Sequence, residues 1–161
     1  MTIDWKGDIA FSDSVAIFRG QIGENHAHAH WASQITVALD GELVFETAAG
    51  TRRAKAAYFT SKTTHRIEPG PWVCSIYFDP LHESLLKTLE GQARDGFMAL
   101  TADALPPELA SLTTRTDLRA LLDSDLLAPI DRTHPRDARF RTVIGEIRER
   151  LADGDDIDRK K

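Results

Sequence analysis

The sequence predicts a β sandwich or barrel followed by a small helical segment. Short runs rich in β-branched and aromatic residues recur between turn residues up to about Pro80, and no helical pattern interrupts them. Leucines at helical spacing appear only after that point. Strands that follow one another without helices between them form antiparallel sheets, because a parallel pair needs a long crossover. The length of 161 residues suits one domain with an appendage.

Six strands are expected before Pro80, over 15–19, 31–39, 42–47, 52–60, 65–68 and 72–79. Asp40-Gly41 separates two of them and predicts a hairpin, since both turn positions must tolerate positive φ. Residues 1–10 form an N-terminal arm, and we expect this arm, with its Trp5, to fold across the mouth of a pocket.

Helical patterns follow over 81–89, from 106 to 122 with a break near 113–116, and over 136–151. We therefore assign 1–80 to a barrel with its arm and 81–161 to a helical extension of the same domain. The last helix carries a narrow apolar stripe, which suits either the domain's own sheet or a partner helix. As a homodimer contact the stripe comprises Phe140, Val143, Ile144, Ile147 and Leu151.

Composition excludes several classes of protein. The formal net charge is −5, from 20 Lys+Arg against 25 Asp+Glu, so the chain lacks the basic excess that gripping DNA by itself requires. The single cysteine, Cys74, rules out an intramolecular disulfide and a cysteine-rich zinc site. No apolar run approaches the ~20 residues of a membrane span, and acidic residues stand where a signal peptide would be basic. We expect a soluble, cytoplasmic protein.

Histidines concentrate in one short region. His26, His28 and His30 alternate with alanine, and His65 follows a later strand. In an extended chain alternate residues share a face, so His28, His30 and Gln34 point one way. Together with His65 they could converge on zinc, iron, nickel or copper, which accept imidazole ligands. The other interpretation is a polar pocket wall or a surface run of histidines.

These residues resemble the first cupin motif: Gly23, then His28-x-His30, Gln34 in place of the usual acid, and Gly41. The second motif is represented only by Gly50 and His65. The resemblance implies a double-stranded β barrel (jelly roll) that holds a divalent metal such as zinc, iron or nickel. Carried over residue by residue, it implies His28, His30, Gln34 and His65 as the metal positions.

Two further passages narrow the resemblance. Residues 73–80, followed by Leu85-Leu86, look like the last barrel strand and helix start of sensor domains in AraC-type transcription regulators. The stretch from His134 to Leu151 is similar to the connector helix that precedes their helix-turn-helix motifs. The resemblance implies a domain that senses a small-molecule effector and dimerises. It also implies that DNA is contacted only through a C-terminal part absent from this chain.

For such a sensor, His26, Tyr58, Trp72 and Tyr77 are candidate ligand-binding residues. We expect no enzymatic activity, because the amide of Gln34 is neutral and cannot act as the general base that a glutamate could provide. The alternative is a stand-alone metal-dependent cupin enzyme, a dioxygenase or an isomerase, since glutamine can still ligate a metal weakly.

Overall fold

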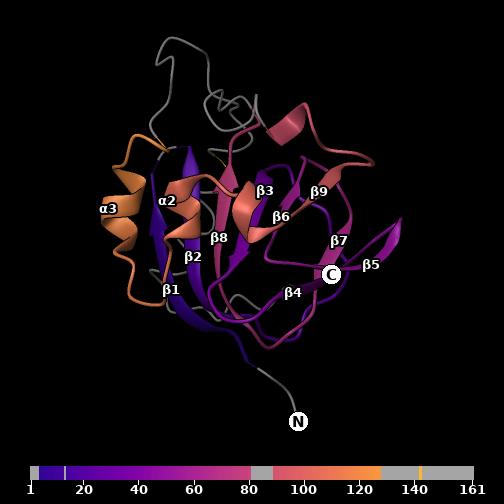
Figure 1. Ribbon diagram of the computed structural model, residues 1–161, viewed down its shortest axis with the longest axis horizontal. Coiled ribbons are helices and arrows are strands. Elements are labelled where there is room, and N and C mark those ends of the chain that lie inside the picture. The colour runs from indigo at the N-terminus through magenta and orange to yellow at the C-terminus, as the bar shows by residue number, and fades with distance from the viewer. Residues whose placement is uncertain (1–3, 13, 81–88, 128–141, 143–161) are drawn as a thin grey trace.

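The computed structural model describes residues 4–12, 14–80, 89–127 and 142, and places nine strands of this part of the chain in two antiparallel sheets (Figure 1). The larger sheet has the strand order β1 (Lys6–Phe11), β2 (Val15–Gln21), β8 (Trp72–Phe78), β3 (Ser33–Ala38), β6 (Ala56–Phe59) and β9 (Phe97–Leu100). The smaller sheet has the order β5 (Gly50–Ala54), β4 (Leu43–Thr47) and β7 (His65–Ile67). This arrangement confirms the mainly β, cupin-like jelly roll expected from the sequence.

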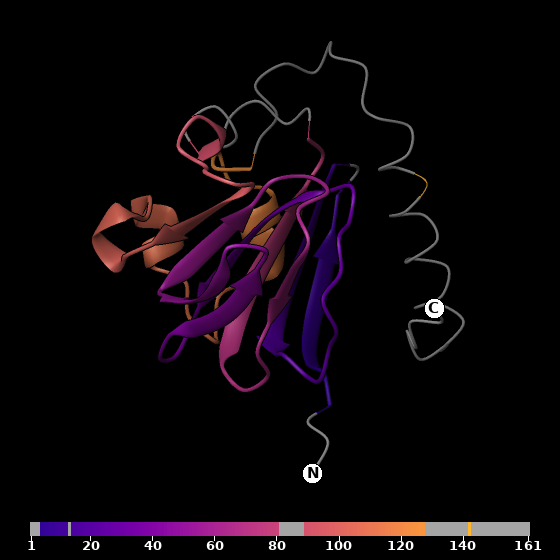
Figure 2. The ribbon, with the colours of Figure 1, turned by 90° about the vertical axis from the view of Figure 1, so that its right-hand side faces the viewer.

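Short helical elements follow the last strand. They are η1 (Ala102–Ala104), α2 (Pro107–Ala110) and α3 (Leu118–Leu122), and α3 contacts β1 and β2 (Figures 1 and 2). The side chain of Asp117 caps α3 by accepting hydrogen bonds from the backbone N–H groups of Arg119 and Ala120. The interruption between α2 and α3 falls where the sequence predicts it, near 113–116. None of the described helices is long and apolar enough to cross a membrane.

Each face of the larger sheet carries apolar residues, and the two faces pack in different cores. On β3, Ile35 and Val37 belong to the cluster that includes the leucines of α2 and α3. Ala38 belongs to a second cluster with Leu43 and Phe45 of the smaller sheet. The period of two along a strand produces this division. Gln34 and Thr36 lie on the same side of β3 as Ala38, so they point into the space between the sheets.

Two glycines hold the edge strand β1 against β2. Gly7 and Gly20 lie opposite one another in the register. A Cβ atom at Gly7 would lie 2.2 Å from the carbonyl oxygen of Arg19, and one at Gly20 would lie 2.0 Å from that of Lys6. Both positions therefore exclude any side chain. Arg19 ties the same region together by bonding the carboxylate of Asp8 and the backbone carbonyl of Thr116.

Most predicted strands are confirmed, with two differences. The run 52–60 is divided, because the chain leaves the smaller sheet after Ala54 and joins the larger one at Ala56. Strands β1 and β9 were not expected: β1 carries charges and a glycine, and β9 lies within 81–161, where we predict helices. The barrel sheet thus continues beyond residue 80.

The predicted hairpin at Asp40-Gly41 is wrong. Gly41 has the positive φ of 59° that the dipeptide suggests, but β3 and β4 on either side belong to different sheets. A turn dipeptide indicates a reversal of the chain and does not choose the strands that pair. Asp40 instead accepts a hydrogen bond from the backbone N–H of Trp72, at 2.7 Å. The hairpin in this region is β4–β5, with Thr47 opposite Gly50.

The predicted helix over 136–151 and the dimer residues Phe140, Val143, Ile144, Ile147 and Leu151 lie outside the described residues, apart from position 142. Most of the predicted helix over 81–89 does so too. The homodimer therefore stays a prediction from the sequence.

Cys74 on β8 is 1% exposed, and burial raises the pKa of its thiol to about 12, against a partial opposing effect of the Arg19 charge. The unfolded chain ionises this thiol near pH 9, whereas the folded chain keeps it protonated. We expect its contribution to the free energy of unfolding to be complete below pH 9 and to be lost as the pH rises from there toward 12.

Urea denaturation of wild type and Cys74→Ala at pH 8, 9.5 and 10.5 isolates this effect, because the other titrating groups are shared by both proteins. The two proteins should differ less in stability at pH 10.5 than at pH 8. Equal reactivity of the native and the urea-unfolded thiol toward a disulfide reagent at pH 8 would contradict the buried, protonated state.

Candidate metal centre

Three histidines from two separate segments meet at one edge of the barrel. His28 and His65 form an isolated antiparallel bridge, with reciprocal N–H to carbonyl hydrogen bonds of 3.0 and 2.9 Å. The carbonyl of His30 accepts from the backbone N–H of Lys62, at 2.8 Å. These bonds bind the segment before β3 to the segment that leads into β7.

The histidines reach the site differently from the sequence prediction. His28 and His30 do not continue strand β3, which begins at Ser33 after a bend at residues 31–32. Their rings converge because the backbone pairs with the segment 62–65. Alternation along one strand is therefore the wrong explanation for these two residues, although it holds for Gln34 and Thr36.

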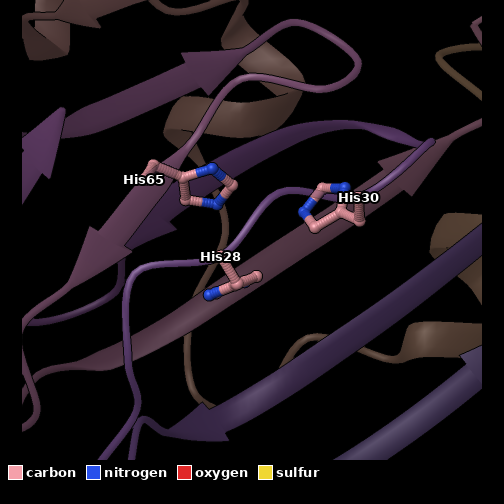
Figure 3. A group of neighbouring side chains, drawn as sticks. All are labelled: His28, His30 and His65. Atoms are coloured by element: carbon pink, nitrogen blue, oxygen red, sulfur yellow. The ribbon is translucent and has the colours of Figure 1, made fainter. Parts of the chain in front are cut away.

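The three rings surround a common space (Figure 3). Their centroids lie 5.7 Å apart for His28 and His30, 4.9 Å for His28 and His65, and 5.3 Å for His30 and His65. One nitrogen from each ring can be chosen so that all three lie within 4.8 Å of one another. Donors on opposite sides of a metal with bonds of about 2.1 Å are about 4.2 Å apart, so small rotations suffice. The three histidines are close enough to bind a metal.

Hydrogen bonds determine which ring nitrogen faces the centre. The Nδ1 atoms of His28, His30 and His65 lie 2.8, 2.8 and 2.9 Å from the backbone carbonyl oxygens of His26, Ala32 and Thr63. A carbonyl oxygen only accepts, so each Nδ1 carries a hydrogen, and the neutral ring has its lone pair on Nε2. Backbone carbonyls hold metal-ligating histidines in this tautomer in many proteins.

Gln34 supplies a fourth donor. Its Oε1 lies 2.8 Å from Nε2 of His30 and 3.0 Å from Nε2 of His65. All three atoms are acceptors when the rings are neutral, so the cluster is favourable only with a proton or a cation among them. Two donors at right angles on a metal with bonds of about 2.1 Å lie about 3.0 Å apart, which matches these distances. The donor set therefore fits a divalent metal.

Aromatic neighbours restrict the rings. His65 is 2% exposed and stacks on Phe59, with centroids 4.0 Å apart and an angle of 9° between the planes. Tyr77 meets the ring of His30 edge-on, at 5.6 Å. These contacts limit rotation and reduce the entropy that metal binding would cost.

A cavity of about 20 Å³ adjoins the cluster, enough for one water molecule or an ion. His28, Gln34, His65, Ser75 and Tyr77 line it together with apolar residues and Asn25, and none of the described lining residues is acidic. Trp5 also lines it and donates a hydrogen bond from Nε1 to the carbonyl of Glu24, at 3.3 Å. Trp5 thus lies beside the cavity, whereas the rest of the expected arm, from Lys6 onward, is part of strand β1.

Of the other predicted ligand-binding residues, one lies at the site and three do not. Tyr77 contacts the site. Tyr58 is fully buried in the helix-facing core, where burial raises its pKa, so it is not a wall of this cavity. The side chain of His26 is outside the three-histidine cluster and only its carbonyl contributes, while Trp72 begins β8 and is absent from the described lining. Ser75, which the sequence suggests only as part of a core strand, does line the cavity.

No family model matches the chain, and no curated protein matches it in sequence. Solved structures share parts of its fold at low similarity. An RmlC-like cupin from Shewanella frigidimarina is 15% identical, with a TM-score of 0.41 over 52% of this chain and 86% of its own. Protein NMB1881 from Neisseria meningitidis is 18% identical, with a TM-score of 0.40 over 46% and 84%. The DMSP lyase DddQ from Ruegeria pomeroyi is 22% identical, with a TM-score of 0.35 over 42% and 39%.

The histidine cluster predicts that the protein binds one metal ion per chain and that substitution of any of the three histidines weakens this binding. Wild type should bind one divalent metal per chain, measured by competition with a chromophoric chelator. His28→Ala, His30→Ala and His65→Ala should each weaken binding by more than about 100-fold, because each removes a direct donor and loss of even an outer-shell partner costs 10–100-fold. His26→Ala is the matched control, since it leaves the backbone carbonyl in place. Equal affinity of all four variants would contradict the site.

Proposed function

We propose that this protein is the effector-sensing and dimerisation domain of an AraC-type transcription regulator, and that its sensing site is a metal centre. The observation that carries the proposal is the cluster of three imidazoles, two of which, those of His30 and His65, also lie within hydrogen-bond distance of the carbonyl oxygen of Gln34. The sequence resemblance supplies the regulatory context.

The donor set supports a transition metal rather than calcium or magnesium. Imidazole nitrogens suit zinc, iron and nickel, whereas hard cations take oxygen ligands. The spacing of about 3 Å between Oε1 of Gln34 and the two Nε2 atoms favours the right-angled positions of a six-coordinate ion, as iron(II) and nickel(II) adopt. When bound, the metal supplies a Lewis-acid position for a small ligand.

The surroundings favour binding over catalysis. Among the described lining residues there is no carboxylate to move a proton, and the amide of Gln34 is neutral. A cavity of about 20 Å³ has room for one water-sized ligand, well below the several hundred Å³ of sites for larger organic molecules. A stand-alone metal-dependent enzyme is the second candidate, because the cluster opens onto this cavity.

Sensing and catalysis differ in what happens to the ligand. Iron(II), nickel(II) or zinc should each raise the melting temperature of wild type, by an amount equivalent to about 2.7 kcal/mol at 100 times the dissociation constant. Small molecules that stabilise the metal-loaded protein further should be recovered unchanged by mass spectrometry. His65→Ala, examined alongside, should show neither shift. Catalytic conversion of a stabilising compound would overturn the sensor and support the enzyme.

A sensor of this kind transmits its state to DNA in the cytoplasm through a dimer, and we propose that the stripe on the predicted helix over 136–151 forms the contact. Wild type should sediment as a dimer at tens of micromolar. Ile147→Lys places a charge in the stripe and should give a monomer, whereas Arg148→Lys should not change the oligomeric state. A wild-type monomer under these conditions would contradict the dimer.

A further inference from the structure

Two hydroxyl groups lie behind the fourth donor, inside the barrel. Thr36 is 0% and Ser75 2% exposed, and the two residues lie opposite one another in the register of β3 and β8. Their Oγ atoms are 2.8 Å apart, and Nε2 of Gln34 donates to Oγ1 of Thr36 at 2.7 Å. Gln34 itself is 3% exposed. Burying a polar group costs free energy unless the group is hydrogen-bonded, and these three side chains are hydrogen-bonded to one another.

We propose that Thr36 and Ser75 are positioning residues that hold the carboxamide of Gln34 with its oxygen toward His30 and His65. The proposal deepens the metal-centre function and rests on it. It makes the uncharged fourth donor the end of a hydrogen-bond chain, Ser75–Thr36–Gln34, that begins at the Ser75 hydroxyl on β8.

The hydrogen-bond chain is needed because the two ends of a carboxamide, its oxygen and its NH2 group, have nearly the same shape. The Nε2 lone pairs of the neutral histidines would attract the NH2 end, which cannot ligate a metal. Thr36 opposes this rotation by accepting a hydrogen bond from the NH2 group, and its own hydroxyl is paired with Ser75. Turning the amide would require the Thr36 hydroxyl to donate to Oε1 of Gln34 in place of accepting from its NH2 group, and that change is coupled to the hydrogen bond between Thr36 and Ser75.

The test replaces hydroxyl groups while keeping side-chain shape. Thr36→Val removes the acceptor, Thr36→Ser keeps it, and Ser75→Ala removes the second hydroxyl. Val37→Ala is the matched control, because Val37 on the same strand packs in the opposite core. Zinc affinity is measured by chelator competition, and cobalt(II) absorption reports the donor set.

We expect Thr36→Val to weaken zinc binding 10–100-fold and to change the cobalt(II) spectrum, as loss of outer-shell partners does elsewhere. Thr36→Ser should lie within about threefold of wild type, and Ser75→Ala between the two. Val37→Ala should lower the melting temperature without altering affinity or spectrum. Unchanged zinc affinity in both Thr36→Val and Ser75→Ala would overturn the proposal, and if one variant does not fold, the other decides.

A metal-free measurement separates this proposal from the metal-centre function. In wild type, the Gln34 side-chain NH2 protons should show nuclear Overhauser contacts to the Thr36 methyl group. Contacts to the imidazole rings in their place would overturn the positioning role, whether or not metal binds. Failure of wild type to bind any metal, with the Thr36 contacts present, would instead refute the proposed function and leave the positioning of the amide supported.

Discussion

The backbone bridge between His28 and His65 holds together two parts of the chain that no strand pairing of the larger sheet would join. Its two hydrogen bonds place the irregular segment before β3 beside the entry to β7. The ring tautomers, the contact of Gln34 with two imidazoles and the cavity all depend on this placement. Two of the three rings come from the irregular segment and the third from the segment that leads into β7, so the pairing of these two segments brings the rings together.

The site has a polar interior wall and an otherwise apolar surrounding. Phe59 supports one imidazole by stacking, and Phe45 packs edge-on against Phe59 at 5.4 Å. Phe45 of the smaller sheet thus supports the site through Phe59, while β3 and β8 supply the hydrogen-bonding groups of the site. A metal held here would have a set of uncharged donors, the imidazoles and the carboxamide of Gln34.

The features that depend on neighbouring residues in the sequence could be predicted from it. Alternation along β3 placed Gln34 and Thr36 together on one face, and the apolar runs located most strands. The sequence patterns and the resemblance to the cupin motifs together named His28, His30, Gln34 and His65 as the donors. The sequence could not reveal that Thr36 lies opposite Ser75, because that register depends on pairing between strands far apart in the chain. The misassigned Asp40-Gly41 turn failed for the same reason: which strands pair is a property of the whole barrel.

Tyr58 and Tyr77 show the same limit for aromatic residues. Both lie on apolar strands, and their composition gives no means of distinguishing a core position from a cavity wall. Which face of the larger sheet a residue occupies decides its surroundings. Tyr58 lies on the face that packs against the helices, and Tyr77 lies beside His30.

The close approach of Gly7 to Gly20 between β1 and β2 makes the effect of a substitution at either position predictable. The two Cα atoms form a seam with no room for a methyl group, and the strand that they secure begins immediately after Trp5. An alanine at either glycine would shift β1 relative to β2, and Trp5 directly precedes β1. A substitution at this seam would therefore alter the wall of the cavity at Trp5 without replacing any of the four donor residues.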